Sequence, residues 1–149
     1  PKLLNFDGSL QTSCYHAPSI WSAIREYFLG IKGAFNKYAP LDTKPTLVDA
    51  VVGAAMFIPK NTIDKVGVFD ERYFMYLEDC DLARRMWEAG WPVYFVHDIV
   101  IAHRHALESA KVPGVFKALF KNRLARIHLQ SWLKYLWKWR YKHRYFGRI

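Results

Sequence analysis

The chain has 149 residues, of which 52% are hydrophobic and 17% are aromatic. This composition excludes intrinsic disorder and allows one domain with a hydrophobic core, and no apolar run approaches the roughly 18 residues of a membrane-spanning helix. The formal net charge of +9 is uneven, because residues 1–109 carry 11 Lys and Arg against 13 Asp and Glu, whereas residues 110–149 carry 11 Lys and Arg and no acid.

The first 19 residues are rich in turn-forming side chains and predict an irregular segment. Ser19 is expected to cap a helix that ends at Gly30, and residues 31–45 are expected to form a surface loop. A buried strand is predicted over residues 47–58, because β-branched and small side chains follow one another there almost without polar interruption. Gly53 marks a point of close backbone approach within it.

The most informative stretch is FDERYFMYLEDCDLARRM, residues 69–86. Leu82, Met86 and Ala89 are spaced as on one face of a helix, and Gly90 supplies the C-terminal stop. The first turn of this helix is expected to hold three carboxylates: Glu78, Asp79 and Asp81.

Two interpretations of this acidic turn stay open. Acids near a helix N-terminus stabilise the helix by about 0.3–1 kcal/mol each, and Arg84 and Arg85 are possible ion-pair partners. Alternatively, the preceding aromatic side chains raise a carboxylate pKa toward the range of a general base, although the helix N-terminus opposes that rise. Carboxylates at 78, 79 and 81 also point in different directions on a helix, so one can face a cleft while another anchors the backbone.

Residues 92–103 predict two short strands, or one bent strand, that end at His103. A zinc site that combines His103 and His105 with Cys14 and His16 is an alternative that we consider weak, because the spacing fits no known zinc module. Cys14 and Cys80 show no CxxC spacing, so a reducing compartment fits best. The chain has no signal-peptide pattern and opens on Pro1 rather than Met, so we expect it to be a piece of a longer protein.

From Pro113 onward the pattern predicts an amphipathic helix in which basic and aromatic side chains interleave. We interpret this tail as a helix that lies on an anionic bilayer, where each cation contributes about 1 kcal/mol. The two alternatives are a helix packed on its own domain and a contact with nucleic-acid phosphates. The aromatic density favours lipid over nucleic acid. The residues expected to contact the membrane are Trp132, Lys134, Trp137, Lys138, Trp139 and Arg140.

The ordered motifs of residues 47–109 resemble the family 2 glycosyltransferases, in particular their rhamnosyltransferase-like branch. The matching positions are Gly53, Phe69-Asp70-Glu71, Glu78-Asp79, Asp81-Leu82, Arg85, Gly90-Trp91 and His103. The resemblance implies an α/β fold in which residues 1–109 form the C-terminal, acceptor-side part of a GT-A nucleotide-diphospho-sugar transferase. A basic helical extension over residues 110–149 would follow this part.

The resemblance also implies a role for individual residues. Asp79 would be the general base on the acceptor hydroxyl, and Glu78 would orient it or bind the acceptor. His103 would approach a divalent metal and the donor diphosphate. Asp81 and Arg85 would tie the helix to its neighbours or contact substrate. The other residues expected to bind substrate are Gly53, Trp91 and Ser109.

The function implied is transfer of a sugar, with rhamnose as a candidate, from a nucleotide-diphosphate donor to a cell-surface polysaccharide or a lipid-linked glycan, with inversion. Mg²⁺ or Mn²⁺ would neutralise the diphosphate in the intact enzyme. The family keeps its nucleotide-binding strands and Asp-x-Asp motif in an N-terminal half that this chain lacks, so the chain alone is expected to be inactive. The expected location is the cytoplasmic face of the plasma membrane, without a specific nucleic-acid partner. The competing hypothesis is a non-catalytic membrane- or polyanion-binding module on a transferase-like scaffold.

Overall fold

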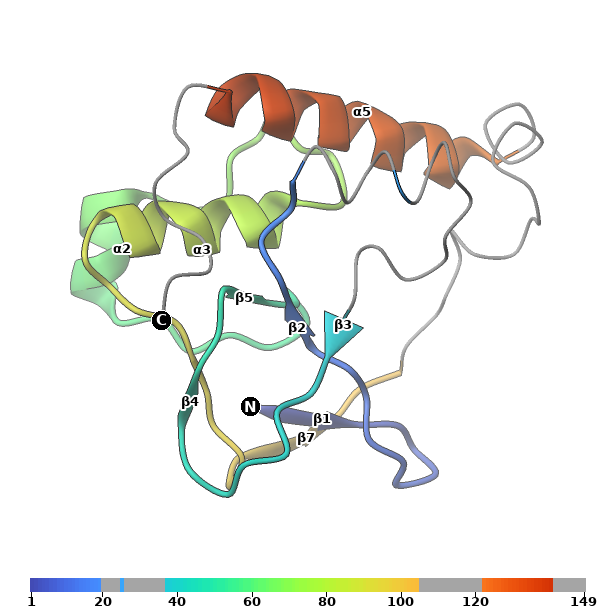
Figure 1. Cartoon of the computed structure of the whole chain (residues 1–149), viewed down its shortest axis with the longest axis vertical. Helices are drawn as coiled ribbons and strands as arrows, with labels where there is room; N and C mark the ends of the chain where they lie inside the picture. Colours follow the sequence, from blue (N-terminus) through green and yellow to red (C-terminus); the bar gives the residue numbers. More distant parts are fainter. Residues whose placement is uncertain (20–24, 26–36, 105–121, 141–149) are drawn as a thin grey trace.

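The computed structural model describes residues 1–19, 25, 37–104 and 122–140. Within these ranges the helices lie on one side of the molecule and the strands on the other (Figure 1). The longest helix, α5 (Arg123–Trp139), lies beyond α3 (Glu78–Glu88), and α3 lies between α5 and the strands, with α2 (Lys60–Val66) beside it. None of the described helices is long and apolar enough to cross a bilayer.

The described strands are short and form three small sheets. β1 (Lys2–Leu4) pairs in parallel with β7 (Val100–Ala102). β2 (Cys14–Tyr15) lies between β3 (Lys37–Tyr38) and β5 (Ala50–Val51) and is antiparallel to both. β4 (Thr46–Leu47) and β6 (Tyr94–Phe95) form an antiparallel pair. The mixed α/β class is therefore confirmed.

Two strand predictions differ from the structure. Residues 1–19 contain β1 and β2, so they are not irregular throughout. The single strand predicted over residues 47–58 is only β4 and β5, because Asp49 interrupts the apolar run and its carboxylate accepts the backbone N–H of Ala17 at 2.9 Å. After β5 the chain turns at Gly53. The two short strands predicted over residues 92–103 are confirmed as β6 and β7.

The predicted helix after the aromatic stretch is confirmed as α3, which carries all three acids in its first turn. Gly90 follows it with φ +81°, a left-handed conformation that glycine adopts without strain. The expected helix at residues 20–29, the boundary at residues 109–110, and His105 and Ser109 lie outside the described residues.

One core joins the sheet of β2, β3 and β5 to both long helices. Cys80 and Ala83 of α3 are buried against Cys14 and Ala50 of the sheet, in a cluster that α5 also enters. The buried side chains that α5 contributes to the cluster are Trp132, Tyr135 and Trp139. The described part of the basic tail thus packs on its own domain. This packing was one of the two alternatives to membrane contact.

Candidate active site at the start of α3

The backbone is strained immediately before α3. Tyr76 and Leu77 have φ of 69° and 67°, a left-handed conformation that side chains other than glycine rarely adopt. Two such residues in succession persist only when the surrounding structure holds them, and Leu77 is buried in the core cluster. Strain of this kind is concentrated at functional sites, and here it sets the direction in which Glu78 and Asp79 enter the helix.

The Asp79 carboxylate is buried and is held by two backbone donors. Its Oδ2 accepts the N–H of Gly53 at 3.1 Å, and its Oδ1 accepts the N–H of Cys80 at 2.8 Å. A Cβ atom at Gly53 would lie 3.7 Å from the Asp79 Cβ. The close approach predicted at Gly53 is therefore an approach to Asp79 itself, and it positions the carboxylate between the turn after β5 and the start of α3.

Burial raises the pKa of Asp79, whereas its backbone hydrogen bonds and the charge of Lys37 lower it. The net direction is upward, which gives this aspartate a higher proton affinity than an exposed one. Asp79 accepts the N–H of Cys80, as the stabilising interpretation of the acidic turn expects, and its raised pKa is compatible with the general-base interpretation, which stays a prediction.

Glu78 is half-buried beside Asp79. Among the described residues, no hydrogen-bond donor reaches its buried Oε2. Burial raises the pKa of Glu78, and the neighbouring Asp79 charge raises it further. A buried carboxylate oxygen without a partner is costly, so Glu78 retains acceptor capacity that a ligand hydroxyl would satisfy.

Lys37 and Tyr15 stand on the sheet beside Asp79, and the sequence analysis missed both. They are directly opposite each other in the β2–β3 pair, with the Lys37 ammonium 5.1 Å from the centroid of the Tyr15 ring. Burial lowers the pKa of Lys37 and raises that of Tyr15, and the Asp79 charge raises both. Lys37 belongs to a stretch interpreted as a surface loop, and only the pairing of β2 with β3 brings it to the site.

His128 of α5 also faces this region. Its ring lies 4.7 Å from the ring of Tyr76, between centroids, and burial together with the Lys37 charge lowers its pKa to about 4. No local motif marks His128, since it reaches the site only because α5 packs on α3. The start of α3 thus combines two carboxylates of raised pKa with a neutral histidine and a lysine.

Asp81 is fully buried and has a different environment from Asp79. Two cations bind its carboxylate, the Lys138 ammonium at 2.7 Å and the Arg85 Nε at 3.0 Å. The Trp139 indole N–H and the Tyr73 hydroxyl donate to its other oxygen at 2.9 and 3.3 Å. Asp81 therefore joins α3 to α5, and its prediction as a substrate-binding residue is wrong because no face of it is open to a ligand.

Arg85 is likewise a structural residue. Besides Asp81, its guanidinium donates to the carbonyl oxygens of Val66 and Val68, the latter at 2.7 Å. These bonds fix the end of α2 and the chain after it against α3. The expectation that Arg85 ties the helix to its neighbours is confirmed, and its expected contact with substrate stays a prediction.

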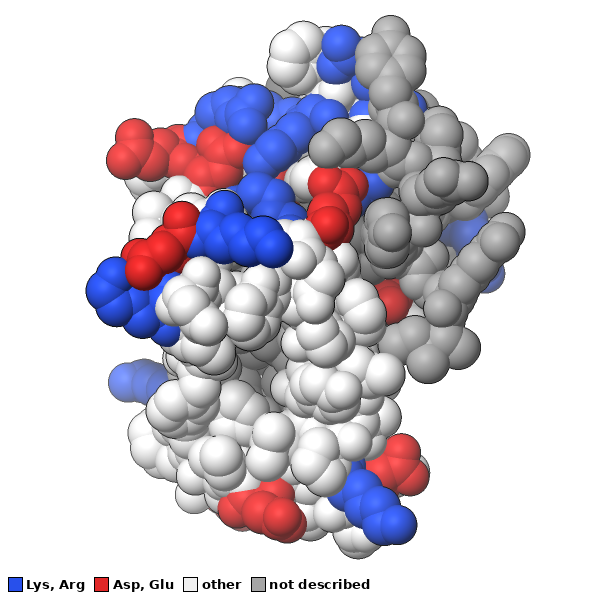
Figure 2. Space-filling model, turned by 90° about the vertical axis from the view of Figure 1, so that its left-hand side faces the viewer, with Lys and Arg blue, Asp and Glu red and all other residues white. Residues whose placement is uncertain are grey.

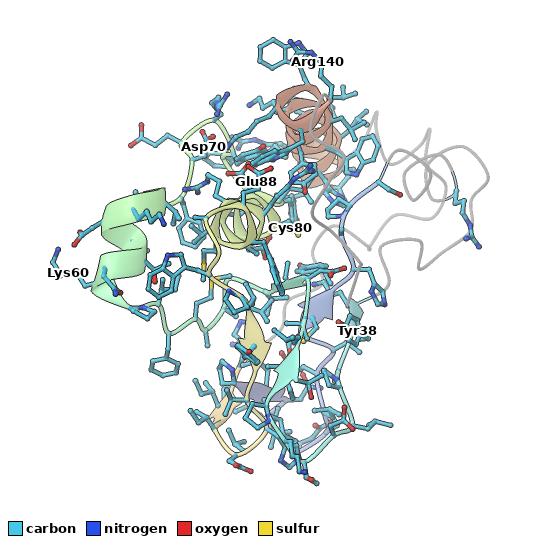
Figure 3. All side chains as sticks on the ribbon, turned by 60° about the vertical axis from the view of Figure 1, so that its left-hand side comes forward. Tyr38, Lys60, Asp70, Cys80, Glu88 and Arg140 are labelled. Carbon is cyan, nitrogen blue, oxygen red and sulfur yellow. The ribbon has the colours of Figure 1, made fainter. Side chains whose placement is uncertain are left out.

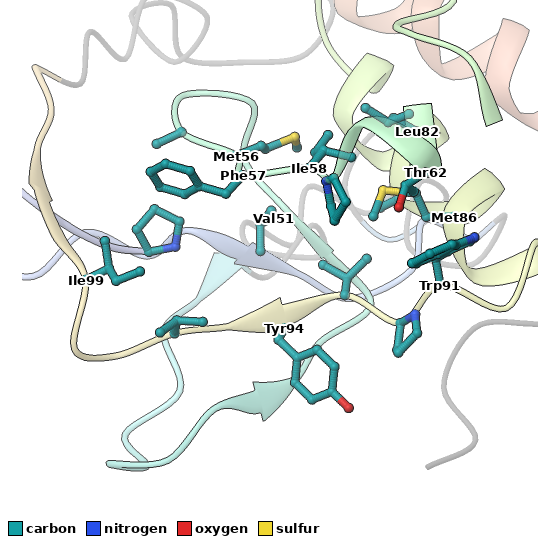
Figure 4. Close-up of a pocket in the computed structure, with 17 residues that line it drawn as sticks. Val51, Met56, Phe57, Ile58, Thr62, Leu82, Met86, Trp91, Tyr94 and Ile99 are labelled. Atoms are coloured by element: carbon teal, nitrogen blue, oxygen red, sulfur yellow. The ribbon is translucent and has the colours of Figure 1, made fainter. Parts of the chain in front are cut away.

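Trp91 lines a hollow of about 270 Å³ that lies between α3, β6 and the segment before α2 (Figure 4). The walls of this hollow are mainly apolar, with Met56, Ile58 and Met86 among them. Asp79 is not part of the lining. The structure therefore does not bring Trp91 together with the candidate base, and an apolar hollow is poorly suited to a charged nucleotide sugar.

His103 follows β7 and is held by residues near the N-terminus. Its Nδ1 lies 3.1 Å from the Gln11 Oε1, and its backbone N–H donates to the carbonyl of Leu4 at 2.9 Å. No group of three His, Cys, Asp or Glu side chains in the described part of the chain is placed to hold a metal ion. The expected approach of His103 to a divalent metal therefore stays a prediction, and the alternative zinc site gains no support from the described residues.

The six residues predicted to contact a membrane divide between two faces of α5. Trp132 and Trp139 are buried in the core, and Lys138 lies 2.7 Å from carboxylate oxygens of both Asp70 and Asp81. The prediction is wrong for these three, because they face α3 rather than the exterior. The other three lie on the outer side: Lys134, Trp137 and Arg140.

Comparison with known proteins places these features in a family. The model of the glycosyl transferase family group 2 matches residues 8–146. An N-acetylglucosaminyl-diphospho-decaprenol L-rhamnosyltransferase of Mycobacterium tuberculosis is 30% identical over 123 residues, which cover 76% of this chain and 39% of that protein. Rhamnosyltransferase WbbL of Escherichia coli is 35% identical over 94 residues, 61% of this chain and 31% of that protein. No solved structure matches the chain.

The chain thus spans less than half the length of these relatives. The family match nevertheless covers nearly all of it, including α3, the turn after β5 and α5. The chain belongs to glycosyl transferase family group 2 and is similar to rhamnosyltransferases.

Proposed function

We propose that this chain is the acceptor-side part of an inverting glycosyltransferase of the GT-A type, with Asp79 as the general base. The observation that carries the proposal is the environment of Asp79. Its carboxylate has a raised pKa and accepts hydrogen bonds from two backbone N–H groups. Within the described residues no cation lies within ion-pair distance of it, in contrast to Asp81.

The proposed reaction forms a bond between an acceptor oxygen and the anomeric carbon of the donor sugar, while the bond from that carbon to the nucleoside diphosphate breaks. The acceptor hydroxyl proton passes to Asp79 as the new bond forms, and inversion follows from attack opposite the leaving group. Glu78, with a buried oxygen that lacks a donor in the described structure, would accept a hydrogen bond from the acceptor and hold it in line.

The donor is proposed to be a nucleotide-diphosphate sugar, with rhamnose as the candidate sugar. A divalent metal such as Mg²⁺ or Mn²⁺ would compensate the charge of the diphosphate when bound. In this proposal the metal and most donor contacts belong to a nucleotide-binding part of the enzyme beyond this chain. The greater length of the relatives supports this assignment.

The acceptor is proposed to be a lipid-linked glycan or a growing cell-surface polysaccharide. The Mycobacterium tuberculosis relative is named for an acceptor sugar carried on diphospho-decaprenol. We propose the same class of acceptor for this chain. Such a substrate would place the enzyme at the cytoplasmic face of the plasma membrane.

The test compares Asp79→Asn with Glu78→Gln in the full-length enzyme, assayed for sugar transfer to a lipid-linked acceptor. Loss of a general base typically costs about 10²–10⁴ in rate, so Asp79→Asn should lower kcat within that range while circular dichroism stays unchanged. Glu78→Gln should chiefly raise the acceptor KM. Near-normal turnover of Asp79→Asn would refute the assignment of Asp79 as the base.

A further inference from the structure

The outer face of α5 exposes large apolar side chains. Leu133 and Trp137 are 56% and 64% exposed, and they lie four residues apart, which places them one above the other on the same side of the helix. Trp132 and Trp139 of the same helix are buried on the opposite side. The exposed pair is therefore not left over from an incomplete core, since α5 already buries a full apolar face against α3.

The loop between α2 and α3 extends this apolar surface. It is fixed to α5 at two points: Lys134 donates to the Arg72 carbonyl at 2.7 Å, and the Ser131 hydroxyl donates to the Met75 carbonyl at 2.7 Å. Phe74 lies between these two carbonyls and is 73% exposed. The loop thus holds a third exposed large apolar side chain beside α5.

A hollow of about 370 Å³ opens between the loop and the helix. Its walls combine the apolar side chains of Leu133 and Trp137 with the cationic side chains of Arg72 and Lys134. Contiguous exposed apolar surface with a polar rim is typical of an interaction site.

The charge of α5 itself is positive, and Asp70 of the neighbouring loop pairs with Arg72 and Lys138. α5 contains four basic residues and no acid, and the Arg140 guanidinium stacks 4.4 Å from the Trp137 ring. Figure 2 shows Lys and Arg interspersed with Asp and Glu in the upper part of this face, above a broad surface that is mostly uncharged, and Figure 3 shows Arg140 at the end of the molecule farthest from the strands. Aromatic rings flanked by cations match a lipid interface, where the rings enter the headgroup region and the cations meet phosphate.

We propose that Phe74, Leu133 and Trp137 form an anchor that inserts into the headgroup region of an anionic lipid surface, with Lys134 and Arg140 contacting lipid phosphates. The anchor uses one face of α5 and the adjoining loop. It therefore leaves out three of the six residues expected from the sequence to contact the membrane. Lipid binding requires no role for Asp79, so this proposal and the proposed function can fail separately.

A short series of contacts links the anchor to the candidate active site. Lys138, one residue after Trp137, binds Asp81 in the first turn of α3, the turn that also holds Asp79. A lipid-bound α5 would therefore hold the start of α3 at a fixed height above the bilayer. This geometry suits an acceptor whose reactive sugar is carried on a lipid.

The test is co-sedimentation of the chain with phosphatidylcholine vesicles that contain or lack phosphatidylglycerol. The test variant combines Leu133→Ser with Trp137→Ser. The matched control is Phe57→Ser, which removes a side chain of similar exposure (74%) from the segment before α2, away from the anchor. Circular dichroism checks that each variant is folded.

The wild type should bind the phosphatidylglycerol vesicles in preference to phosphatidylcholine alone. Because each buried apolar side chain contributes substantially to partitioning, the double variant should bind at least about ten-fold more weakly, and the control should bind as the wild type does. Absence of binding by the wild type, equal loss in the control, or full retention by the double variant would overturn the proposal. Sedimentation velocity without lipid addresses a second copy as the occupant: a dimer that the double variant dissociates would also overturn it.

Discussion

The two sides of the first turn of α3 hold aspartates in opposite environments. On the sheet side, Asp79 accepts hydrogen bonds from two backbone N–H groups. On the α5 side, Asp81 is surrounded by two cations, an indole and a phenol. The residues are only two positions apart, yet a buried ion pair fixes one, and the other keeps a raised pKa.

Under the proposed function, one helical turn separates a structural task from a chemical one. Asp81 is fully buried and ion-paired and so joins α3 to α5, whereas Asp79 is held by backbone donors and keeps both its orientation and a raised pKa. The cations that neutralise Asp81 come partly from α5, so the packing of α5 determines which carboxylate remains reactive.

The largest effect should come from neutralising Asp81. Asp81→Asn leaves the half-buried Arg85 without its carboxylate partner and leaves Lys138 with Asp70 alone, and breaking a buried pair in this way typically costs about 3–5 kcal/mol. Asp79→Asn should cost less than about 1.5 kcal/mol, since the amide oxygen can keep one backbone bond and burial no longer penalises a charge. Urea unfolding followed by circular dichroism measures both values.

Lys138→Met is the control for this comparison. It removes one cation from Asp81 but leaves Arg85 in place, so its effect on the free energy of unfolding should lie between those of the two aspartate variants. Equal stability losses in Asp79→Asn and Asp81→Asn would show that the two sides of the turn do not differ as proposed.

The sequence located the acidic turn but could not separate its members. The motif and the helical period placed Glu78, Asp79 and Asp81 correctly in the first turn of α3. Which aspartate is paired depends on Lys138 and Trp139, more than fifty residues later in the chain, and periodicity carries no information on such a distant contact. The same limit explains Trp132 and Trp139, since an aromatic, basic helix has the same pattern whether a ring faces lipid or a protein core.

The strands were predicted less well, for a physical reason. Most described strands contain two or three residues, too few for an alternating pattern to emerge. Lys37 illustrates the consequence, because it reaches the site through the pairing of β3 with β2 rather than through a local motif. The close backbone approach at Gly53 could be predicted, because a glycine within an apolar run is a local signal of such an approach.

The two sides of the turn should also respond to acid in different pH ranges. On the Asp79 side, the pKa of His128 is about 4 against an ordinary value of 6.5. The unfolded chain therefore binds a proton more readily than the folded one between these values, so this contribution to stability is present above pH 6.5 and is lost as the pH falls toward 4. At 1.36 kcal/mol per pKa unit, the difference of about 2.5 units corresponds to a loss of roughly 3 kcal/mol.

On the Asp81 side, the pKa of Asp70 is lowered, mainly by Arg72 and then by Lys138. The contribution of Asp70 to stability is present above pH 3.8, the ordinary pKa of an aspartate, and is lost only at lower pH. The unfolding free energies of the wild type and His128→Gln are measured from pH 7 to 4. Their difference isolates the effect of the histidine, because both proteins have the same carboxylates. Parallel curves for the two proteins over this range would contradict the assignment.

The smallest effect is expected from Lys37, whose charge lowers the pKa of Asp79 without an ion pair in the described structure. Lys37→Met should raise the pKa of Asp79, measured by carbon-detected NMR titration of the carboxyl group, whereas Lys37→Arg should restore it. In the full-length enzyme the acid limb of the pH–rate profile should move upward in the same variant, while turnover at neutral pH changes by less than about ten-fold. If Lys37 had only a structural role, its replacement would change the free energy of unfolding and would leave both the pKa of Asp79 and the pH–rate profile unchanged. A change in the Asp79 titration that arginine reverses would therefore identify Lys37 as the residue that holds the base ionised until the acceptor hydroxyl arrives.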